Sequence, residues 1–157
     1  MKIGFIGLNH QGESLIKSFL QAQTFLPTEI IVYDLNKDKA DFITSSYPGI
    51  FAAQHSRELI QEASCFFLTS DENEYKIIKK EIQSETKPSH VLISLMHSVS
   101  VEELETDLPC KIAKIHANSD CSQIYSFSTG SRMNQVERNW LKQLFSTITY
   151  SRKSATL

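Results

Sequence analysis

The opening of the chain, MKIGFIGLNHQG, places a short apolar run before Gly7 and another glycine, Gly12, shortly after it. The apolar residues that follow recur at helical spacing, at Leu15, Ile16, Phe19 and Leu20. A strand, a glycine turn and a helix in this order form the unit whose first helical N–H groups cradle a pyrophosphate. The opening therefore predicts a strand over residues 2–6 and an anion cradle at the turn after it.

Strand-like and helix-like segments alternate through the rest of the chain. Runs of β-branched and aromatic residues predict strands over residues 29–34, 50–53, 64–70, 90–95, 110–117 and 124–129. Helical patterns fill the gaps, with start signals at Asn36, Ser56, Asp71 and Ser100, and a last helix carried by Val136, Trp140, Leu141 and Leu144. Strands separated by helices lie parallel, because each connection must cross over. We therefore expect an α/β fold, a Rossmann-type doubly wound, mostly parallel sheet with helices on both faces.

The bulk composition fits one globular domain and excludes several classes of partner. With 157 residues, 41% of them hydrophobic, we expect a dinucleotide-binding domain over residues 1–150 and a tail over residues 151–157. A net charge of -2 gives no attraction for nucleic acid. No apolar run approaches the roughly 20 residues of a membrane span and no signal peptide opens the chain. We therefore expect a cytoplasmic protein without a membrane partner.

The cysteines and serines do not form a recognisable catalytic or metal site. Cys65, Cys110 and Cys121 are odd in number and far apart, which predicts reduced, mostly buried thiols. No Cys-x-x-Cys pair occurs, and the spacing from His116 to Cys121 has nothing to complete it, so we predict no metal site. The serines of residues 94–100 lack the Gly-x-Ser-x-Gly turn of a hydrolase.

The glycine turn departs from the usual pattern at its middle position. Three glycines do separate work in such a turn: the first bends the chain, the second admits the pyrophosphate and the third lets the helix pack on the strand. Gly7 and Gly12 hold the first and third positions, and Asn9 holds the second. Asparagine adopts left-handed backbone conformations more readily than most residues, so we expect the turn to form. Its side chain occupies space that a phosphate needs, and this conflict competes with an amide hydrogen bond to the ligand.

Asp34 ends the second predicted strand, about 20 residues beyond the turn, where an acidic side chain commonly holds the adenosine ribose hydroxyls. A carboxylate there repels a 2′-phosphate. We therefore favour NAD over NADP as the cofactor, although Lys37 and Lys39 are near enough to soften that preference. The alternative is that Asp34 caps the following helix or faces water.

Long segments of the chain match the pattern of one known family. The segment MKIGFIG, followed by Gly12, has the family's opening. The segment KPSHVLISLMHSVSVEELETDLPCKIAKIHANS follows its lysine-proline pair, apolar strand, serine-rich turn, helix and strand leading to an R-x-M-P-N motif, and FSTGSRMNQVERNWLKQLFSTI follows its next strand and helix. Over essentially its whole length, the chain resembles the N-terminal domain of the pyrroline-5-carboxylate reductase family, and within it the late competence proteins of Bacillus-type bacteria.

The resemblance implies an NAD(P)-binding domain of a reductase-like protein. It stops where the family's C-terminal helical domain, which makes the dimer and contributes the substrate pocket, would begin. We therefore expect no catalytic residue and no reductase activity from the chain alone, because hydride transfer requires a positioned substrate. Part of the last helix would be a face left bare by the missing domain, which favours a weak homodimer.

Several positions where the ligand would lie depart from the family pattern. The middle glycine is Asn9, the V-K-P segment aligns with residues 70–72, the A-A-G turn with residues 96–98, and R-x-M-P-N with residues 114–118. An acid thus replaces a base after the fourth strand, at Asp71. The alternative to a cofactor-binding domain is therefore a non-enzymatic scaffold or regulatory protein that has lost the cofactor.

Histidines follow several of the predicted strands. His10, His97 and His116 should lie at the carboxyl edge of the sheet, where open α/β folds bind ligands. No family role maps onto these histidines, so we assign them no catalytic role, while His55 aligns with a residue on the adenine side. For the dinucleotide we predict contacts from Gly7, Leu8, Asn9, His10, Gln11, Gly12, Asp34, His55, Thr69, Ser70 and His97.

Overall fold

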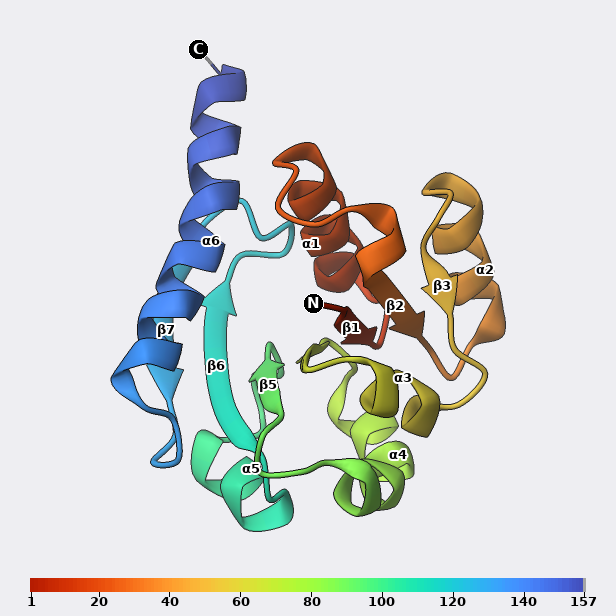
Figure 1. Ribbon diagram of the computed structural model, residues 1–157, viewed down its shortest axis with the longest axis vertical. Coiled ribbons are helices and arrows are strands. Elements are labelled where there is room, and N and C mark those ends of the chain that lie inside the picture. Colours follow the sequence, from red (N-terminus) through yellow and green to blue (C-terminus); the bar gives the residue numbers. More distant parts are fainter. Residues whose placement is uncertain (157) are drawn as a thin grey trace.

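A computed structural model describes residues 1–156, apart from the side chains of residue 125 and of residues 149–156. One seven-stranded sheet lies between two layers of helices (Figure 1). The strands are β1 (Ile3–Ile6), β2 (Ile30–Tyr33), β3 (Phe51–Ala52), β4 (Cys65–Leu68), β5 (Val91–Ser94), β6 (Lys111–Ala117) and β7 (Ile124–Thr129). The helices are α1 (His10–Gln21), α2 (Lys37–Ser46), α3 (Ser56–Glu62), α4 (Glu72–Glu85), α5 (Val101–Asp107) and α6 (Gln135–Thr156), with a 3-10 turn, η1, over Pro27–Glu29.

The strand order is β3-β2-β1-β4-β5-β6-β7. All neighbouring pairs are parallel except β6 and β7, which are antiparallel. The chain leaves β1 for β2 on one side and later reaches β4 on the other, so the order reverses at β1. The carboxyl end of the strand at such a reversal is where doubly wound folds bind ligands. The predicted fold, with β1 inside the sheet, is therefore confirmed.

The central strands are apolar throughout because helices cover both of their faces. Every residue of β1 and of β4 is buried. Parallel pairing places Phe5 of β1 opposite Phe67 of β4, and their rings stack with centroids 4.9 Å apart. Phe19 of α1 and Phe145 of α6 pack against the Phe67 ring at 5.7 Å and 6.0 Å. This aromatic cluster joins the two central strands to the helices above them.

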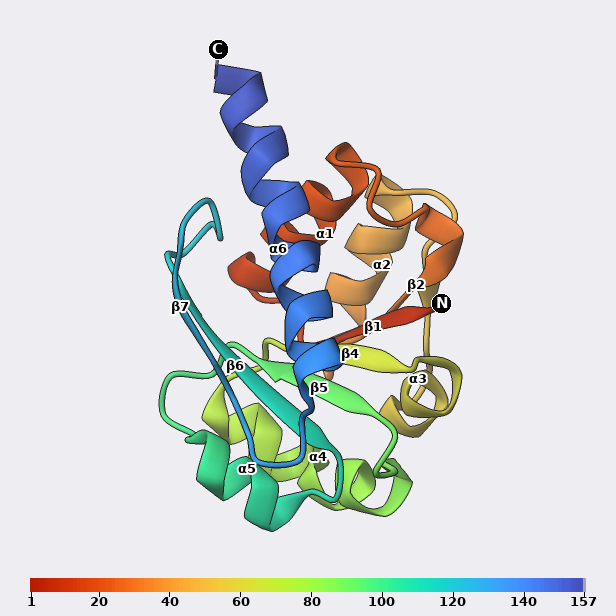
Figure 2. The same cartoon turned by 60° about the vertical axis from the view of Figure 1, so that its left-hand side comes forward.

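The two helix layers have separate apolar cores. On one face, α1, α2 and α6 bury residues that include Leu15, Ile43 and Leu141. On the other, α3, α4 and α5 bury residues that include Leu59, Ile82 and Leu104. Figure 2 shows the two layers on opposite sides of the sheet. Among the described residues, no helix is both long and apolar enough to traverse a bilayer.

The helix starts follow the predicted capping residues. The side chains of Asn36, Asp71 and Ser100 accept hydrogen bonds from backbone N–H groups in the first turns of α2, α4 and α5. Asp71 thus caps α4. Cys65, Cys110 and Cys121 are buried and not joined by disulfides, as predicted. Helix α6 runs to Thr156 and includes most of residues 151–157.

Replacing Phe67 by alanine tests the aromatic cluster. Phe67 is fully buried against three other rings, so Phe67→Ala should lower the free energy of unfolding by about 3–5 kcal/mol. Phe51, with 53% of its surface exposed, gives a matched control, and Phe51→Ala should cost less than about 1 kcal/mol. Chemical denaturation measures both, and equal costs would contradict the assignment of the core.

His90 is a buried histidine held in one tautomer at the start of β5. Its Nδ1 accepts a hydrogen bond from the Lys87 N–H at 2.8 Å, so the proton is on Nε2, which lies 3.0 Å from the Ile60 carbonyl oxygen. Burial lowers the pKa of His90 below its ordinary value of 6.5, and the charge of Lys87 acts in the same direction. The folded state therefore favours the neutral ring.

The stability of the protein should depend on pH through His90. Because the folded-state pKa is the lower one, the unfolded chain binds a proton first as the pH falls below 6.5. The free energy of unfolding should therefore decrease from pH 6.5 downward, by at most about 1.4 kcal/mol per pH unit for this one group. Between about pH 5 and pH 7, the free energy of unfolding of His90→Gln, measured by chemical denaturation, should change less steeply with pH than that of the wild type. His55→Gln, at an exposed position, should keep the wild-type slope; an unchanged slope in His90→Gln would exclude this histidine as the source.

Candidate functional site

The turn after β1 requires glycine at position 7. Gly7 has φ of 88°, in the region that side chains rarely adopt. A Cβ atom there would lie 2.4 Å from the Ser70 backbone nitrogen, so no larger residue fits. The Gly7 N–H donates to the Tyr33 carbonyl oxygen at 2.9 Å. The turn thus packs against the end of β4 on one side and is hydrogen-bonded to β2 on the other.

Gly12 permits close packing of α1 on the end of β4. A Cβ atom at Gly12 would lie 2.6 Å from the Thr69 Oγ1 and 2.9 Å from the Gly7 carbonyl oxygen. The Thr69 hydroxyl donates to that same carbonyl oxygen, and the Thr69 N–H donates to the Ile6 carbonyl oxygen at 2.9 Å. Gly7, Gly12 and Thr69 therefore form one compact unit, in which the Thr69 hydroxyl bonds to the backbone of the turn.

The turn forms with Asn9 at its middle position, as expected, but Asn9 needs no left-handed backbone to form it. Its φ of -72° and ψ of -178° are extended, and it is the N-cap residue of α1. Its side-chain Oδ1 accepts a hydrogen bond from the Gly12 N–H at 2.9 Å. Asparagine also serves as a helix N-cap, and that use needs an extended backbone. One of the N–H groups that the turn offers to an anion is consequently bonded to Asn9.

Asp34 is buried and holds the turn together. The carboxylate accepts from the Leu8 N–H at 2.7 Å and from the Asn36 N–H at 2.8 Å, and only 8% of the residue is exposed. Asn36 caps α2 in its place, so the alternative that Asp34 caps the helix or faces water is wrong. A carboxylate has about four acceptor positions, so these two bonds leave acceptor capacity for further donors.

The carboxyl edge next to Asp34 is acidic. Partial burial raises the pKa of Glu74 above its ordinary value, and the charges of Asp71 and Asp34 raise it further, while Lys39 lowers it. Asp71, Asp34 and Glu74 thus interact electrostatically, although they come from three separate segments. Sequence analysis missed the contribution of Glu74, because its position in the first turn of α4 faces Asp34 only after the sheet has assembled.

A buried hydroxyl without a partner lies beside the turn. Ser70 is 4% exposed, and among the described residues its Oγ has no hydrogen-bond partner. The Ser70 Cβ lies 2.9 Å from the position that a Cβ atom at Gly7 would take, so Ser70 packs directly against the turn. An unpaired buried hydroxyl costs free energy, which a ligand with acceptor atoms at this position would recover.

The remaining predicted contact residues lie on both sides of the turn. A hollow at the carboxyl ends of β2 and β3 is lined by residues that include Tyr33, Asp34, Leu35, Ala53 and Gln54. His55 follows as the exposed N-cap residue of α3. His10 is exposed at the start of α1, and His97 is exposed in the loop after β5. The structure therefore brings the predicted residues of the turn together with Asp34, Thr69 and Ser70, and places His55 and His97 at opposite flanks.

Gln11 connects the start of α1 to the loop after β6. Its side-chain Nε2 donates to the Asn118 carbonyl oxygen at 3.2 Å and to the Ala117 carbonyl oxygen at 3.4 Å. The Cys121 thiol lies 3.8 Å from the Gln11 carbonyl oxygen. The loop between β6 and β7 thus packs on the first turn of α1, and Gln11 is the residue through which it does so.

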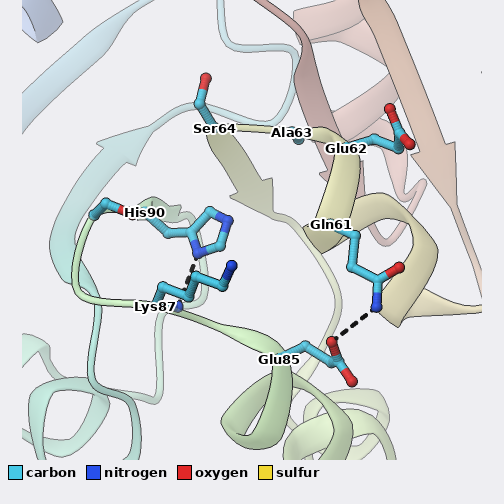
Figure 3. Close-up of a pocket in the computed structure, with 8 residues that line it drawn as sticks. Gln61, Glu62, Ala63, Ser64, Glu85, Lys87 and His90 are labelled. Carbon is cyan, nitrogen blue, oxygen red and sulfur yellow. Dashed lines mark hydrogen bonds between the residues drawn. The ribbon is translucent and has the colours of Figure 1, made fainter.

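A separate hollow lies at the opposite, amino edge of the sheet (Figure 3). It is lined by residues of the α3–β4 and α4–β5 connections, including Gln61, Glu85, Lys87 and His90. Gln61 donates to Glu85 at 3.1 Å, and His90 accepts from Lys87, so these groups satisfy one another. Its place at the amino edge puts it outside the dinucleotide site.

The described residues contain no group of three or more metal-ligating side chains.

Comparison with known proteins gives several relatives of this chain. ComE operon protein 4 of Bacillus subtilis (strain 168) is 28% identical over 115 residues, which are 73% of this chain and 42% of that protein. The pyrroline-5-carboxylate reductase of Escherichia coli (strain K12) is 27% identical over 103 residues, 66% of this chain and 38% of that enzyme. The chain thus spans less than half the length of these two relatives.

Solved structures share the fold at low sequence identity. A pyrroline-5-carboxylate reductase from Coxiella burnetii superposes with a TM-score of 0.77 at 21% identity, covering 94% of this chain and 56% of that one. The Plasmodium falciparum pyrroline carboxylate reductase with NADP bound gives 0.80 at 16% identity, covering 94% and 55%. The prephenate dehydrogenase from A. aeolicus, in complex with NAD+, gives 0.75 at 15% identity, covering 94% and 57%.

These relatives confirm the resemblance to the pyrroline-5-carboxylate reductases that the sequence motifs indicated. A broader family, described as NADP oxidoreductase, coenzyme F420-dependent, matches residues 2–98, which include the turn, Asp34, Thr69 and Ser70. Since that match extends over more than half of the chain, this protein belongs to the NADP oxidoreductase, coenzyme F420-dependent family.

Proposed function

We propose that the chain is the NAD(P)-binding domain of an oxidoreductase of the pyrroline-5-carboxylate reductase type, related to the late competence proteins. The observation that carries this proposal is the glycine turn at the order reversal of the sheet, beside the buried Ser70 hydroxyl that has no partner among the described residues. A nicotinamide dinucleotide bound there would supply or accept a hydride. The chain's part is to bind and orient it, in a cytoplasmic protein that associates weakly through α6.

The residues of the turn fit a dinucleotide, with one competitor. Helix α1 leaves its first N–H groups without acceptors inside the helix, and its positive end favours the pyrophosphate. Leu8, His10, Gln11 and Ser70 lie around that end, while Asn9 bonds the Gly12 N–H. We propose that the ribose contacts Asp34, that His55 lies on the adenine side, and that His97 lies toward the nicotinamide. The cofactor must therefore displace, or bind beside, the Asn9 side chain.

The preferred cofactor is NAD. Asp34, Asp71 and Glu74 concentrate negative charge at the ribose end of the site, where NADP carries an additional phosphate. Lys39 offsets part of that charge. Relatives with each cofactor are known, because the Plasmodium falciparum structure holds NADP and that from A. aeolicus holds NAD+. For this chain, the negative charge at the ribose end favours NAD+.

Removing the Asn9 side chain should strengthen cofactor binding. Asn9→Gly frees the Gly12 N–H and opens the cradle, so the affinity for NAD should rise by about 1 kcal/mol, roughly fivefold in Kd. Asn134→Gly is the matched control, because Asn134 caps α6 through the Glu137 N–H at 2.9 Å, away from the carboxyl edge. Calorimetric titration measures both, and the control should leave the NAD affinity unchanged. An Asn9→Gly protein with the wild-type affinity would show that this side chain is no obstacle.

Neutralising Glu74 should weaken the preference for NAD over NADP. Glu74→Gln removes one negative charge near Asp34 without breaking the bonds that hold the turn. The ratio of NADP to NAD affinity should increase by about 0.5 kcal/mol, roughly twofold. Glu102→Gln, on the exposed start of α5, serves as the control and should not change the ratio. This affinity ratio is measured by letting the two cofactors compete while nicotinamide fluorescence is followed. A ratio that falls in Glu74→Gln would contradict the charge argument.

The alternative function is a scaffold or regulatory protein without a cofactor. The Asn9 cap favours it, because the turn already has an internal acceptor for the Gly12 N–H. Titration of the wild-type chain with NAD, NADH, NADP and NADPH separates the two functions. Saturable binding of any of them supports the dinucleotide domain, and no binding of any at millimolar concentration would leave the scaffold as the function.

A further inference from the structure

A second group of polar side chains lies beyond the turn, at the carboxyl ends of β5 and β6. The ring centroids of His97, in the loop after β5, and His116, near the end of β6, are 6.4 Å apart, with the ring planes at 42°. His97 is exposed and His116 is half-buried. The two rings therefore face solvent together, although they are 19 residues apart by number, because β5 and β6 are neighbours in the sheet.

Lys114 fixes the loop that carries His97. It is 7% exposed, and its Nζ donates to the His97 carbonyl oxygen at 3.2 Å and to the Val99 carbonyl oxygen at 2.9 Å. The loop after β5 is thus bonded to the strand that carries His116. Two hydrogen bonds, one buried and one partly buried, therefore fix the backbone that carries His97 relative to the strand that carries His116.

The strand positions around the histidines carry hydroxyls and bases. Lys114 and His116 are two residues apart in β6, so their side chains lie on the same face of the strand. In the neighbouring strand β7 they pair with Ser128 and Ser126. In β5, on the other side of β6, Ser94 pairs with Lys114. None of these strand positions holds a carboxylate. In contrast to the acidic ribose end, this end of the carboxyl edge therefore has donor groups and a buried cation.

We propose that His97 and His116 form a binding site for an oxyanion, the carboxylate or phosphate group of a small molecule. An oxyanion that accepts one N–H bond of about 2.8 Å from each ring spans a gap of this size. A metal ion fits less well, because the described residues provide no third ligand and the ammonium group of Lys114 lies directly behind the loop. The site is separate from the glycine turn, and of its two histidines only His97 is also a proposed dinucleotide contact.

Histidine ring resonances test the site directly. The full chain is titrated with sodium phosphate, malonate or acetate at constant ionic strength and pH, with chloride as the reference, while the imidazole signals are followed by NMR. The signals of His97 and His116 should shift together and saturate, and those of His55 should not. A response to phosphate alone assigns a phosphate group, one to malonate or acetate alone a carboxylate, and one to all a general oxyanion site.

Substitutions then test whether the pair acts as a unit. His97→Gln and His116→Gln should each weaken anion binding, and the double variant should lose at least about tenfold in affinity. His55→Gln, which removes a different exposed histidine, should retain it, and thermal unfolding confirms that the variants fold. His116→Gln leaves His97, the proposed dinucleotide contact, in place, so loss of anion binding with intact NAD binding in this variant separates the site from the turn. Ring signals that respond to no anion, or an unchanged affinity in the double variant, would overturn the proposal.

Discussion

The close approach of Gly7 to the end of β4 is the constraint on which the carboxyl edge depends. Because no Cβ atom fits between Gly7 and Ser70, the turn lies directly on the neighbouring strand. The Thr69 hydroxyl and the Asp34 carboxylate then hold it from either side. These contacts come from three separate strands, so the turn keeps its shape only in the assembled sheet. The same packing positions the first N–H groups of α1 for an anion.

The two ends of the carboxyl edge differ in charge, although they belong to one sheet. Acidic groups surround Asp34 at the ends of β2 and α4, whereas Lys114 and two histidines lie at the ends of β5 and β6. A net charge of -2 conceals this separation, because it sums over the whole chain. Ligands with unlike ends, one rich in hydroxyls and one anionic, match such an edge better than ligands of uniform charge.

Much of the fold could be predicted from the sequence, because apolar runs and capping residues act locally. The buried strands and the caps at Asn36, Asp71 and Ser100 follow from nearest neighbours. The pairing of His97 with His116, and the burial of Lys114, could not, because they depend on the register of β5 against β6. The capping role of Asn9 could not be predicted for a different reason: asparagine occurs both with a left-handed backbone and as an extended N-cap, and the sequence does not choose between them.

The Asn9 side chain acts as a ligand that is tethered to its own site. Its oxygen is covalently linked three residues from the Gly12 N–H, so it competes at a high effective concentration that dilution cannot reduce. A phosphate of the proposed dinucleotide would have to displace this oxygen to reach the Gly12 N–H, and on its release the oxygen would return. Cofactor exchange as proposed for this site would therefore be a substitution of one acceptor for another.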